Sequence, residues 1–234
     1  MVAQPTEAFR HPAGGYVFVV TYGRSGSTVL QNLLNTLPGY QIKGENNNAL
    51  FPLFQSWRAI AHSPDIDRMR RTQGRSDARH PWFGAENIDA NTYRTALCGF
   101  FAQTILQPAP KVVVSGFKEI RTIADPVRFR EYLDFMKDGF PQARFVFNTR
   151  NHDAVVRSSW WRKHDPEQVK VMMRSAERVF RDFAAAHPDC ALGVHYDDYV
   201  ADHAAFEPLF TLLKAHPTEE ALRTVMATRL KHAT

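Results

Sequence analysis

The chain has 234 residues, 44% of them hydrophobic and 23% charged, with a net charge of +5. This length and composition predict one folded domain with a sizeable core. The small positive charge comes without a long basic run or a basic and aromatic repeat, so nucleic acid is not expected as a partner. No apolar run approaches the roughly 20 residues that a membrane span needs.

The first residues and the cysteines bear on the compartment. Residues 1–15 are polar, contain two prolines and lack the apolar core of a signal peptide, so we expect a flexible N-terminus. Cys98 and Cys190 form no motif, which predicts free thiols in a reducing compartment. These features predict a cytoplasmic protein, and the compact size of the chain favours a bacterial one.

Short apolar runs alternate with helical patterns along the chain. They predict strands near 17–21, 41–43, 112–115, 144–149 and 191–195. Such alternation is typical of a parallel sheet covered by helices on both faces. We therefore predict an α/β fold over residues 1–234, a single three-layer domain with about five parallel strands. Residues 58–90 have weak periodicity and are predicted to form an irregular insertion that covers an acceptor site or is simply mobile.

The first strand runs into a small loop rich in hydroxyl groups. It reads Tyr22-Gly23-Arg24-Ser25-Gly26-Ser27-Thr28, and the helix after it stops at Pro38-Gly39. Glycines let backbone N–H groups turn toward an anion, and the start of a helix adds unsatisfied donors and partial positive charge. The pattern predicts a P-loop-like fold whose phosphate-binding residues are Arg24, Ser25, Gly26, Ser27 and Thr28.

This loop differs from the loop that binds nucleoside triphosphates. That motif, G-x-x-x-x-G-K-[ST], places its lysine on the terminal phosphates and its last hydroxyl on magnesium. Counting back from Gly26, the first glycine position holds Thr21, and the lysine position holds Ser27. A kinase that uses ATP and magnesium remains an alternative, as does a nucleotide-binding module without catalytic activity.

A second motif follows the strand near 144–149. Arg150 ends the strand, and Ser158 lies eight positions later on a helix that Asn151 or Asp153 would cap and that would run through Trp161. A guanidinium fork and a hydroxyl that converge suit a phosphate monoester, and Arg162 lies one turn beyond Ser158. The alternative is that Arg150 and Ser158 are ordinary polar surface residues.

Together, and in this order, the two motifs resemble those of sulfotransferases that use 3′-phosphoadenosine-5′-phosphosulfate (PAPS). GRSGST with L-x-x-L-L and P-G resembles their 5′-phosphosulfate motif, the segment from Arg150 to Ser158 resembles their 3′-phosphate motif, and HYDDYV at 195–200 resembles their later Tyr-Glu-Asp-Leu-Val segment. The resemblance implies that PAPS donates a sulfuryl group to a hydroxyl of a carbohydrate or small-molecule acceptor. The nucleotide product would be adenosine 3′,5′-bisphosphate.

The general base is also assigned through this resemblance. An acceptor hydroxyl needs a group that takes its proton, and a carboxylate is a usual choice. Carbohydrate and tyrosyl-protein sulfotransferases place a Gly-Glu pair after the second strand, which Gly44-Glu45 matches. Strand, helix and strand would return Glu45 to the sheet edge that carries the phosphate loop. The alternative is a solvated loop glutamate.

The second catalytic residue implied by the resemblance is Lys118, which follows the strand predicted within 111–115. Related sulfotransferases place a lysine after the corresponding strand, where a cation stabilises the charge that grows on the leaving oxygen. The alternative is a salt bridge between Lys118 and Glu119 or Asp125.

Three further residues have weaker support. Tyr196 matches a tyrosine that contacts the nucleotide in tyrosyl-protein-type relatives, although a core position would suit it equally. Relatives carry a basic segment near the C-terminus, so Arg229 or Lys231 would close over the 3′-phosphate.

The ten histidines form no ligand pattern, and no metal is expected. The sequence leaves the oligomeric state open.

Overall fold

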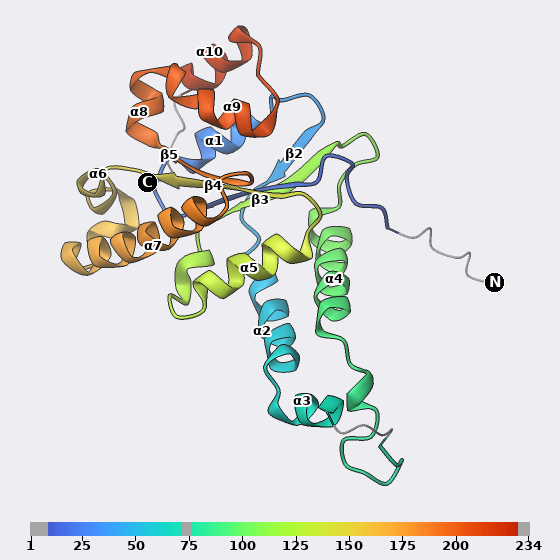
Figure 1. Ribbon diagram of the computed structural model, residues 1–234. Coiled ribbons are helices and arrows are strands. Elements are labelled where there is room, and N and C mark those ends of the chain that lie inside the picture. Colours follow the sequence, from blue (N-terminus) through green and yellow to red (C-terminus); the bar gives the residue numbers. More distant parts are fainter. Residues whose placement is uncertain (1–8, 72–75, 229–234) are drawn as a thin grey trace, which may run out of the picture.

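The computed structural model describes residues 9–71 and 76–228 and contains one central sheet (Figure 1). The strand order is β2-β3-β1-β4-β5, and every neighbouring pair is parallel. The predicted α/β class with about five parallel strands is therefore confirmed. The strands span the following residues: β1 Tyr16–Thr21, β2 Tyr40–Lys43, β3 Val114–Glu119, β4 Ala143–Thr149 and β5 Ala191–His195.

Strand β1 lies at the centre of the sheet, and all six of its residues are buried. Successive side chains of a strand point to opposite faces. Tyr16, Phe18 and Val20 therefore enter one hydrophobic cluster, and Val17 and Val19 enter another. This double burial explains why the strand reads as a continuous apolar run rather than an alternating one.

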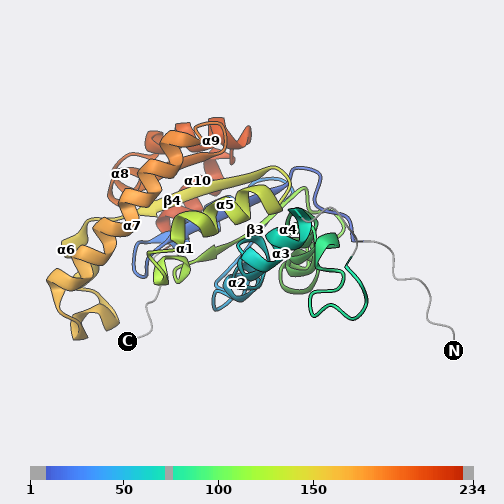
Figure 2. The same cartoon turned by 60° about the horizontal axis from the view of Figure 1, so that its bottom comes forward.

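Helices cover both faces of the sheet (Figures 1 and 2). One face packs against α1 Ser27–Leu34, α8 Tyr196–Ala201, α9 Glu207–Leu213 and α10 Glu219–Ala227. The other packs against α5 Phe129–Gly139, α6 His152–Val156 and α7 Pro166–Ala186. Short 3₁₀ turns occupy Ala85–Asn87, Thr122–Ala124, Ser159–Lys163 and His203–Phe206. Within the described residues, no helix has the length and apolar character needed to cross a membrane.

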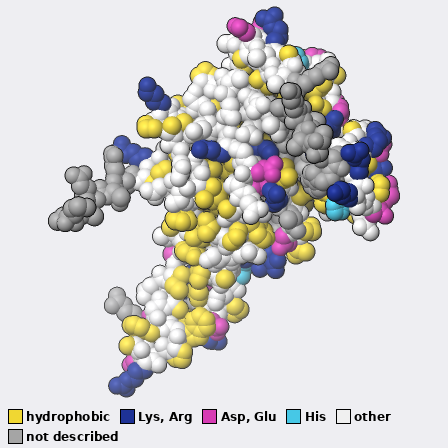
Figure 3. Space-filling view, turned by 180° about the vertical axis from the view of Figure 1, so that it is seen from behind, with side chains coloured by type: hydrophobic (Ala, Val, Ile, Leu, Met, Phe, Trp, Pro, Cys, Tyr) yellow, Lys and Arg dark blue, Asp and Glu magenta, His cyan; other side chains and the backbone are white. Residues whose placement is uncertain are grey.

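An arm projects from the second face of the sheet (Figure 1). It consists of α2 Leu50–Ala61, α3 Pro64–Arg71, α4 Ala90–Phe101 and the segments between them, and a π-helical turn, Ala102–Leu106, follows α4. The base of the arm is part of the main core, because Phe54 and Phe101 belong to the larger hydrophobic cluster. Hydrophobic side chains gather over the arm on the face seen in Figure 3. Phe83 and Phe100, both in the arm, are exposed.

The segment 58–90, predicted to be irregular, contains the end of α2 and all of α3. Helix α3 begins at Pro64. It carries acidic residues in its first turn and basic residues in its last turn. These features favour a helix through the proline geometry and the helix dipole. Periodicity missed α3 because the helix buries only Ile66 and Met69. The described part of the predicted flexible N-terminus, residues 9–15, is also attached: His11 Nδ1 lies 2.6 Å from the Tyr16 hydroxyl.

Two predicted boundaries are wrong. Strand β3 forms at 114–119 rather than 112–115, so Lys118 lies inside the strand. Pairing with β1, from Tyr16 with Ser115 to Val20 with Glu119, sets these bounds, and Val113 is 47% exposed despite its apolar character.

Helix α6 ends at Val156 and does not run through Trp161. The Ser158 hydroxyl donates to the Val155 carbonyl, 2.7 Å away, and Ser158 itself is extended. A serine hydroxyl that bonds a nearby carbonyl competes with the next helical hydrogen bond. The predicted cap at Asn151 is confirmed, since its side chain accepts from the Ala154 N–H.

Substitution of Gly116 is expected to weaken the pairing of β1 and β3. A Cβ atom there would lie 1.8 Å from the Val17 carbonyl oxygen, a backbone atom that cannot move without disturbing the sheet. We expect Gly116→Ala to lower the free energy of unfolding by about 1–3 kcal/mol or more. Gly99→Ala is the control, because its Cβ would meet only His11 at 3.9 Å. Urea denaturation measures the stability of both variants. Equal stability of Gly116→Ala and Gly99→Ala would show that the close approach of the strands does not matter.

Candidate functional site

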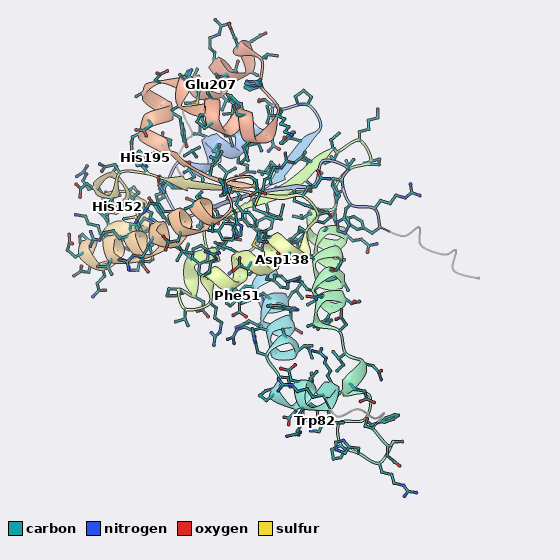
Figure 4. All side chains as sticks on the ribbon, in the orientation of Figure 1. Phe51, Trp82, Asp138, His152, His195 and Glu207 are labelled. Carbon is teal, nitrogen blue, oxygen red and sulfur yellow. The ribbon has the colours of Figure 1, made fainter. Side chains whose placement is uncertain are left out.

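A cavity of about 700 Å³ lies at the carboxyl ends of the strands. In open parallel sheets this edge is the usual place for ligands. Among the described residues, none between 58 and 90 lines the cavity, and Figure 4 shows Trp82 at the far tip of the arm. Figure 4 places His152, which follows β4, and His195, the last residue of β5, away from Trp82. The described residues of segment 58–90 therefore do not line this cavity.

The phosphate loop forms one wall of the cavity. Arg24 and Gly26 both have positive φ, 69° and 81°, and Gly26 is the N-cap of α1. Such left-handed residues turn neighbouring N–H groups to one side, where they bind anions. Arg24, Gly26, Ser27 and Thr28, which the sequence predicts to bind phosphate, line the cavity together with Gly23.

Ser25 supports the loop from behind its cavity-facing side chains. Ser25 is fully buried, and its hydroxyl lies 2.7 Å from the Thr21 hydroxyl. The Thr21 hydroxyl also lies 2.6 Å from the backbone carbonyl oxygen of Asn148. The Asn148 side chain donates to the Ser25 carbonyl oxygen over 2.9 Å. The Thr21 hydroxyl and the Asn148 side chain thus fasten Ser25 to β4, and Ser25 is not among the residues that line the cavity.

Arg150 and Tyr196 form the part of the cavity wall next to the loop. The Arg150 guanidinium donates to the Arg24 carbonyl oxygen over 3.1 Å and lies 4.4 Å from the centre of the Tyr196 ring, within cation–π range. A Cβ atom on Gly26 would come within 2.0 Å of the Tyr196 ring, so only glycine permits this packing. The loop, the end of β4 and the start of α8 therefore meet in one place.

Two of the three described arginines that line this cavity, Arg24 and Arg150, retain unused donors. The Nε atoms of Arg24 and Arg150 are buried and have no hydrogen-bond partner among the described residues. A buried polar group without a partner costs free energy, and more so when it is charged. An anionic ligand with phosphate oxygens would supply the missing acceptors, so the residues fit a nucleotide with more than one phosphate group.

Tyr22 fixes the backbone of Arg150. Its hydroxyl accepts from the Arg150 N–H over 2.9 Å and donates to Glu177, 2.8 Å away. Glu177 also contacts His152 Nε2 at 2.9 Å. Burial, followed by the charge of Glu177, raises the pKa of the Tyr22 phenol, which therefore keeps its proton as a donor. This network was not identified from the sequence because its members lie on three separate segments.

Ser158 and Arg162 do not reach the cavity. Ser158 is occupied with the Val155 carbonyl, and Arg162 is exposed in the turn at Ser159–Lys163; neither lines the cavity in the described part of the chain. Their predicted convergence with Arg150 required a helix through Trp161, and α6 ends too early for that. Arg229 and Lys231 lie outside the described residues, although Met226 and Thr228 line the cavity just before them.

Glu45 and Lys118 meet at the floor of the cavity. Lys118 Nζ lies 2.6 Å from Glu45 Oε1, and Arg121 Nη1 lies 3.1 Å from Glu45 Oε2. Lys118 is buried, whereas Glu45 is partly open to the cavity. Lys118 pairs with Glu45 rather than with Glu119, because consecutive strand residues point to opposite faces of a sheet. Asp125 pairs with Arg128 instead.

Glu119 builds the support beneath this pair. It is fully buried, and its carboxylate accepts four backbone hydrogen bonds. Oε2 accepts from Asn46 (3.1 Å) and Asn48 (2.8 Å), and Oε1 accepts from Ile120 (2.9 Å) and Arg121 (3.0 Å). Glu119 therefore ties the loop after β2 to the end of β3. The sequence did not predict this role for Glu119, because the strand was expected to end at residue 115.

Comparison with known proteins gives one family and one fold. Residues 16–206 match the model of the sulfotransferase family. No curated protein matches the chain. Among solved structures, the sulfotransferase domain of the Synechococcus PCC 7002 olefin synthase is similar with a TM-score of 0.59 and 20% identity, covering 97% of this chain and 82% of that one. The sulfotransferase domain from the curacin biosynthetic pathway has a TM-score of 0.56 and 16% identity, covering 92% and 78%. At these identities the two structures support the fold.

Glu119→Gln tests the support beneath the ion pair. An amide offers one accepting oxygen, so two of the four N–H groups would face an NH₂ group instead. We expect the free energy of unfolding to fall by about 1–3 kcal/mol. Hydrogen exchange should accelerate either at Asn46 and Asn48 or at Ile120 and Arg121. Glu167→Gln, at a side chain 72% exposed, is the control. Unchanged stability and exchange in Glu119→Gln would show that the carboxylate does not hold the two segments together.

Proposed function

The chain belongs to the sulfotransferase family, and we propose that it transfers a sulfuryl group from PAPS to a hydroxyl group of a carbohydrate or small-molecule acceptor. One observation carries this proposal: the carboxylate of Glu45 and the ammonium group of Lys118 lie 2.6 Å apart in the cavity that also holds the phosphate loop. A module that only binds nucleotides would have no use for a carboxylate and a cation at this position.

The residues of the cavity suit the PAPS nucleotide. The N–H groups at the start of α1, with Arg24, Ser27 and Thr28, would hold the 5′-phosphosulfate. The Arg150 guanidinium would hold the 3′-phosphate, since its Nε lacks a partner. The Tyr196 ring offers an aromatic surface for the adenine beside Arg150. We do not assign Ser158 or Arg162 to the nucleotide, because neither lines the cavity.

The chemistry of transfer assigns different tasks to Glu45 and Lys118. PAPS supplies a sulfur–oxygen bond that breaks as the acceptor oxygen bonds to sulfur, and adenosine 3′,5′-bisphosphate leaves. Glu45 takes the proton of the acceptor hydroxyl as general base. Lys118 places positive charge where negative charge develops on the leaving oxygen. The Glu45 oxygens each accept one hydrogen bond from a cation, and each retains a second lone-pair site for the acceptor proton.

Glu45→Gln separates catalysis from binding. The amide keeps an oxygen for Lys118 but cannot take a proton, so we expect kcat to fall by about 10²–10⁴-fold. Affinity for adenosine 3′,5′-bisphosphate should change little, because the phosphate-binding groups remain. Release of the bisphosphate from PAPS with an alcohol acceptor measures turnover, and Glu207→Gln, at an exposed position, is the control. Substantial residual turnover in Glu45→Gln would remove Glu45 from this role.

Arg150→Ala tests recognition of the 3′-phosphate. Loss of a charge-assisted hydrogen bond of about 1.5–3 kcal/mol should weaken the binding of adenosine 3′,5′-bisphosphate roughly 10- to 150-fold. AMP, which lacks the 3′-phosphate, should lose much less affinity in the same calorimetric titration. Arg157→Ala, an exposed arginine that does not line the cavity, should bind both nucleotides normally. Equal losses for the two nucleotides in Arg150→Ala would contradict the assignment.

A further inference from the structure

A second cavity, of about 780 Å³, lies beside the first. Its walls come from the start of the phosphate loop, the segment after β3, the turn at Ser159–Lys163 and one side of α7. Ile123, Phe129, Trp161 and Ala176 form buried parts of the wall. Arg121 is the one charged side chain among the described residues that line it.

The two cavities share a border. Gly23, Ile120 and Arg121 line both. Arg121 marks the point of contact with the catalytic groups, because its guanidinium lies 3.1 Å from Glu45 Oε2. A molecule in the second cavity can therefore present an atom at this border toward Glu45.

The wall at this border is held in place by the fold. The Trp161 indole N–H donates to the Gly23 carbonyl oxygen over 3.0 Å. Phe129 packs edge to face against Phe180, with ring centres 5.8 Å apart. The cavity is therefore formed before any ligand arrives, as is usual for small-molecule sites.

We propose that this second cavity binds the hydrocarbon body of the acceptor, so that the acceptor is an alcohol on an apolar chain or ring. The inference rests on the proposed function and narrows it to one class of acceptor. The acceptor oxygen bonds to sulfur, its proton passes to Glu45, and the sulfur–oxygen bond to the leaving phosphate breaks. The hydrocarbon body only anchors the hydroxyl at the border.

Burial and hydrogen bonding favour this class over sugars. Each buried methylene group gains free energy from leaving water. A sugar would bring several hydroxyl groups to a wall made mainly of hydrocarbon, and buried hydroxyls without partners cost free energy. The polar side chains Gln168 and Ser175 are exposed residues of α7, and Val171, also on α7, is 58% exposed. The buried wall therefore offers few partners to a sugar.

The test compares acceptors of increasing length. Bisphosphate release from PAPS is measured with 1-butanol, 1-hexanol, 1-octanol and glucose. We expect kcat/KM to rise about fourfold per methylene group, so that 1-octanol exceeds 1-butanol on the order of 100-fold and glucose reacts more slowly than 1-octanol. Ser175→Trp places a large ring in the lining of the cavity, and the ratio of 1-octanol to 1-butanol should fall below about tenfold. Ala185→Trp, exposed on the same helix outside the cavity, should keep the wild-type ratio.

The outcomes separate this inference from the proposed function. Calorimetric titration with adenosine 3′,5′-bisphosphate is carried out on the same three proteins. If the nucleotide binds but glucose reacts as well as 1-octanol, or chain length has no effect, the apolar acceptor is wrong and the transferase proposal stands. An equal ratio in Ser175→Trp and the wild type also overturns the inference. If the nucleotide does not bind to the wild type, both proposals fail.

Discussion

The candidate site depends on one buried carboxylate, Glu119. A buried charge is costly unless it is hydrogen-bonded, and four backbone N–H groups provide these bonds. Two of them come from the loop after β2 and two from the end of β3, so the charge can be satisfied only when both segments are in place. Glu45 and Lys118 lie directly beside this junction, and their 2.6 Å contact follows from it. The carboxylate therefore acts as a positioning group for the pair.

Different contacts hold the side of the cavity that we propose binds the nucleotide. Tyr22 holds the backbone of Arg150, and the Tyr196 ring packs directly on Gly26. Arg24 and Arg150 both line this cavity, and each keeps a buried Nε donor without a hydrogen-bond partner among the described residues. Arg121 then connects this cavity to the apolar one. The three proposed tasks, phosphate binding, proton transfer and acceptor binding, thus meet at the carboxyl edge of a single sheet.

The sequence predicted the features that depend on local pattern. Strand periodicity indicated the parallel sheet, and the loop, Glu45, Lys118, Arg150 and Tyr196 do line one cavity. It placed Ser158 and Arg162 wrongly, because their expected position depended on a helix through Trp161 and α6 ends at Val156. The role of Glu119 and the apolar cavity could not be predicted, because both are made by contacts between segments far apart in the chain. Composition and spacing carry no record of such contacts.

If this cavity recognises a nucleotide by its 3′-phosphate and carries out sulfuryl transfer, adenosine 3′,5′-bisphosphate should bind to the wild-type protein much more tightly than AMP or ATP plus magnesium. Calorimetric titration of the wild-type protein with the three nucleotides measures this difference. Preference for ATP with magnesium would favour a kinase instead, and equal affinity for AMP and the bisphosphate would remove the role of Arg150.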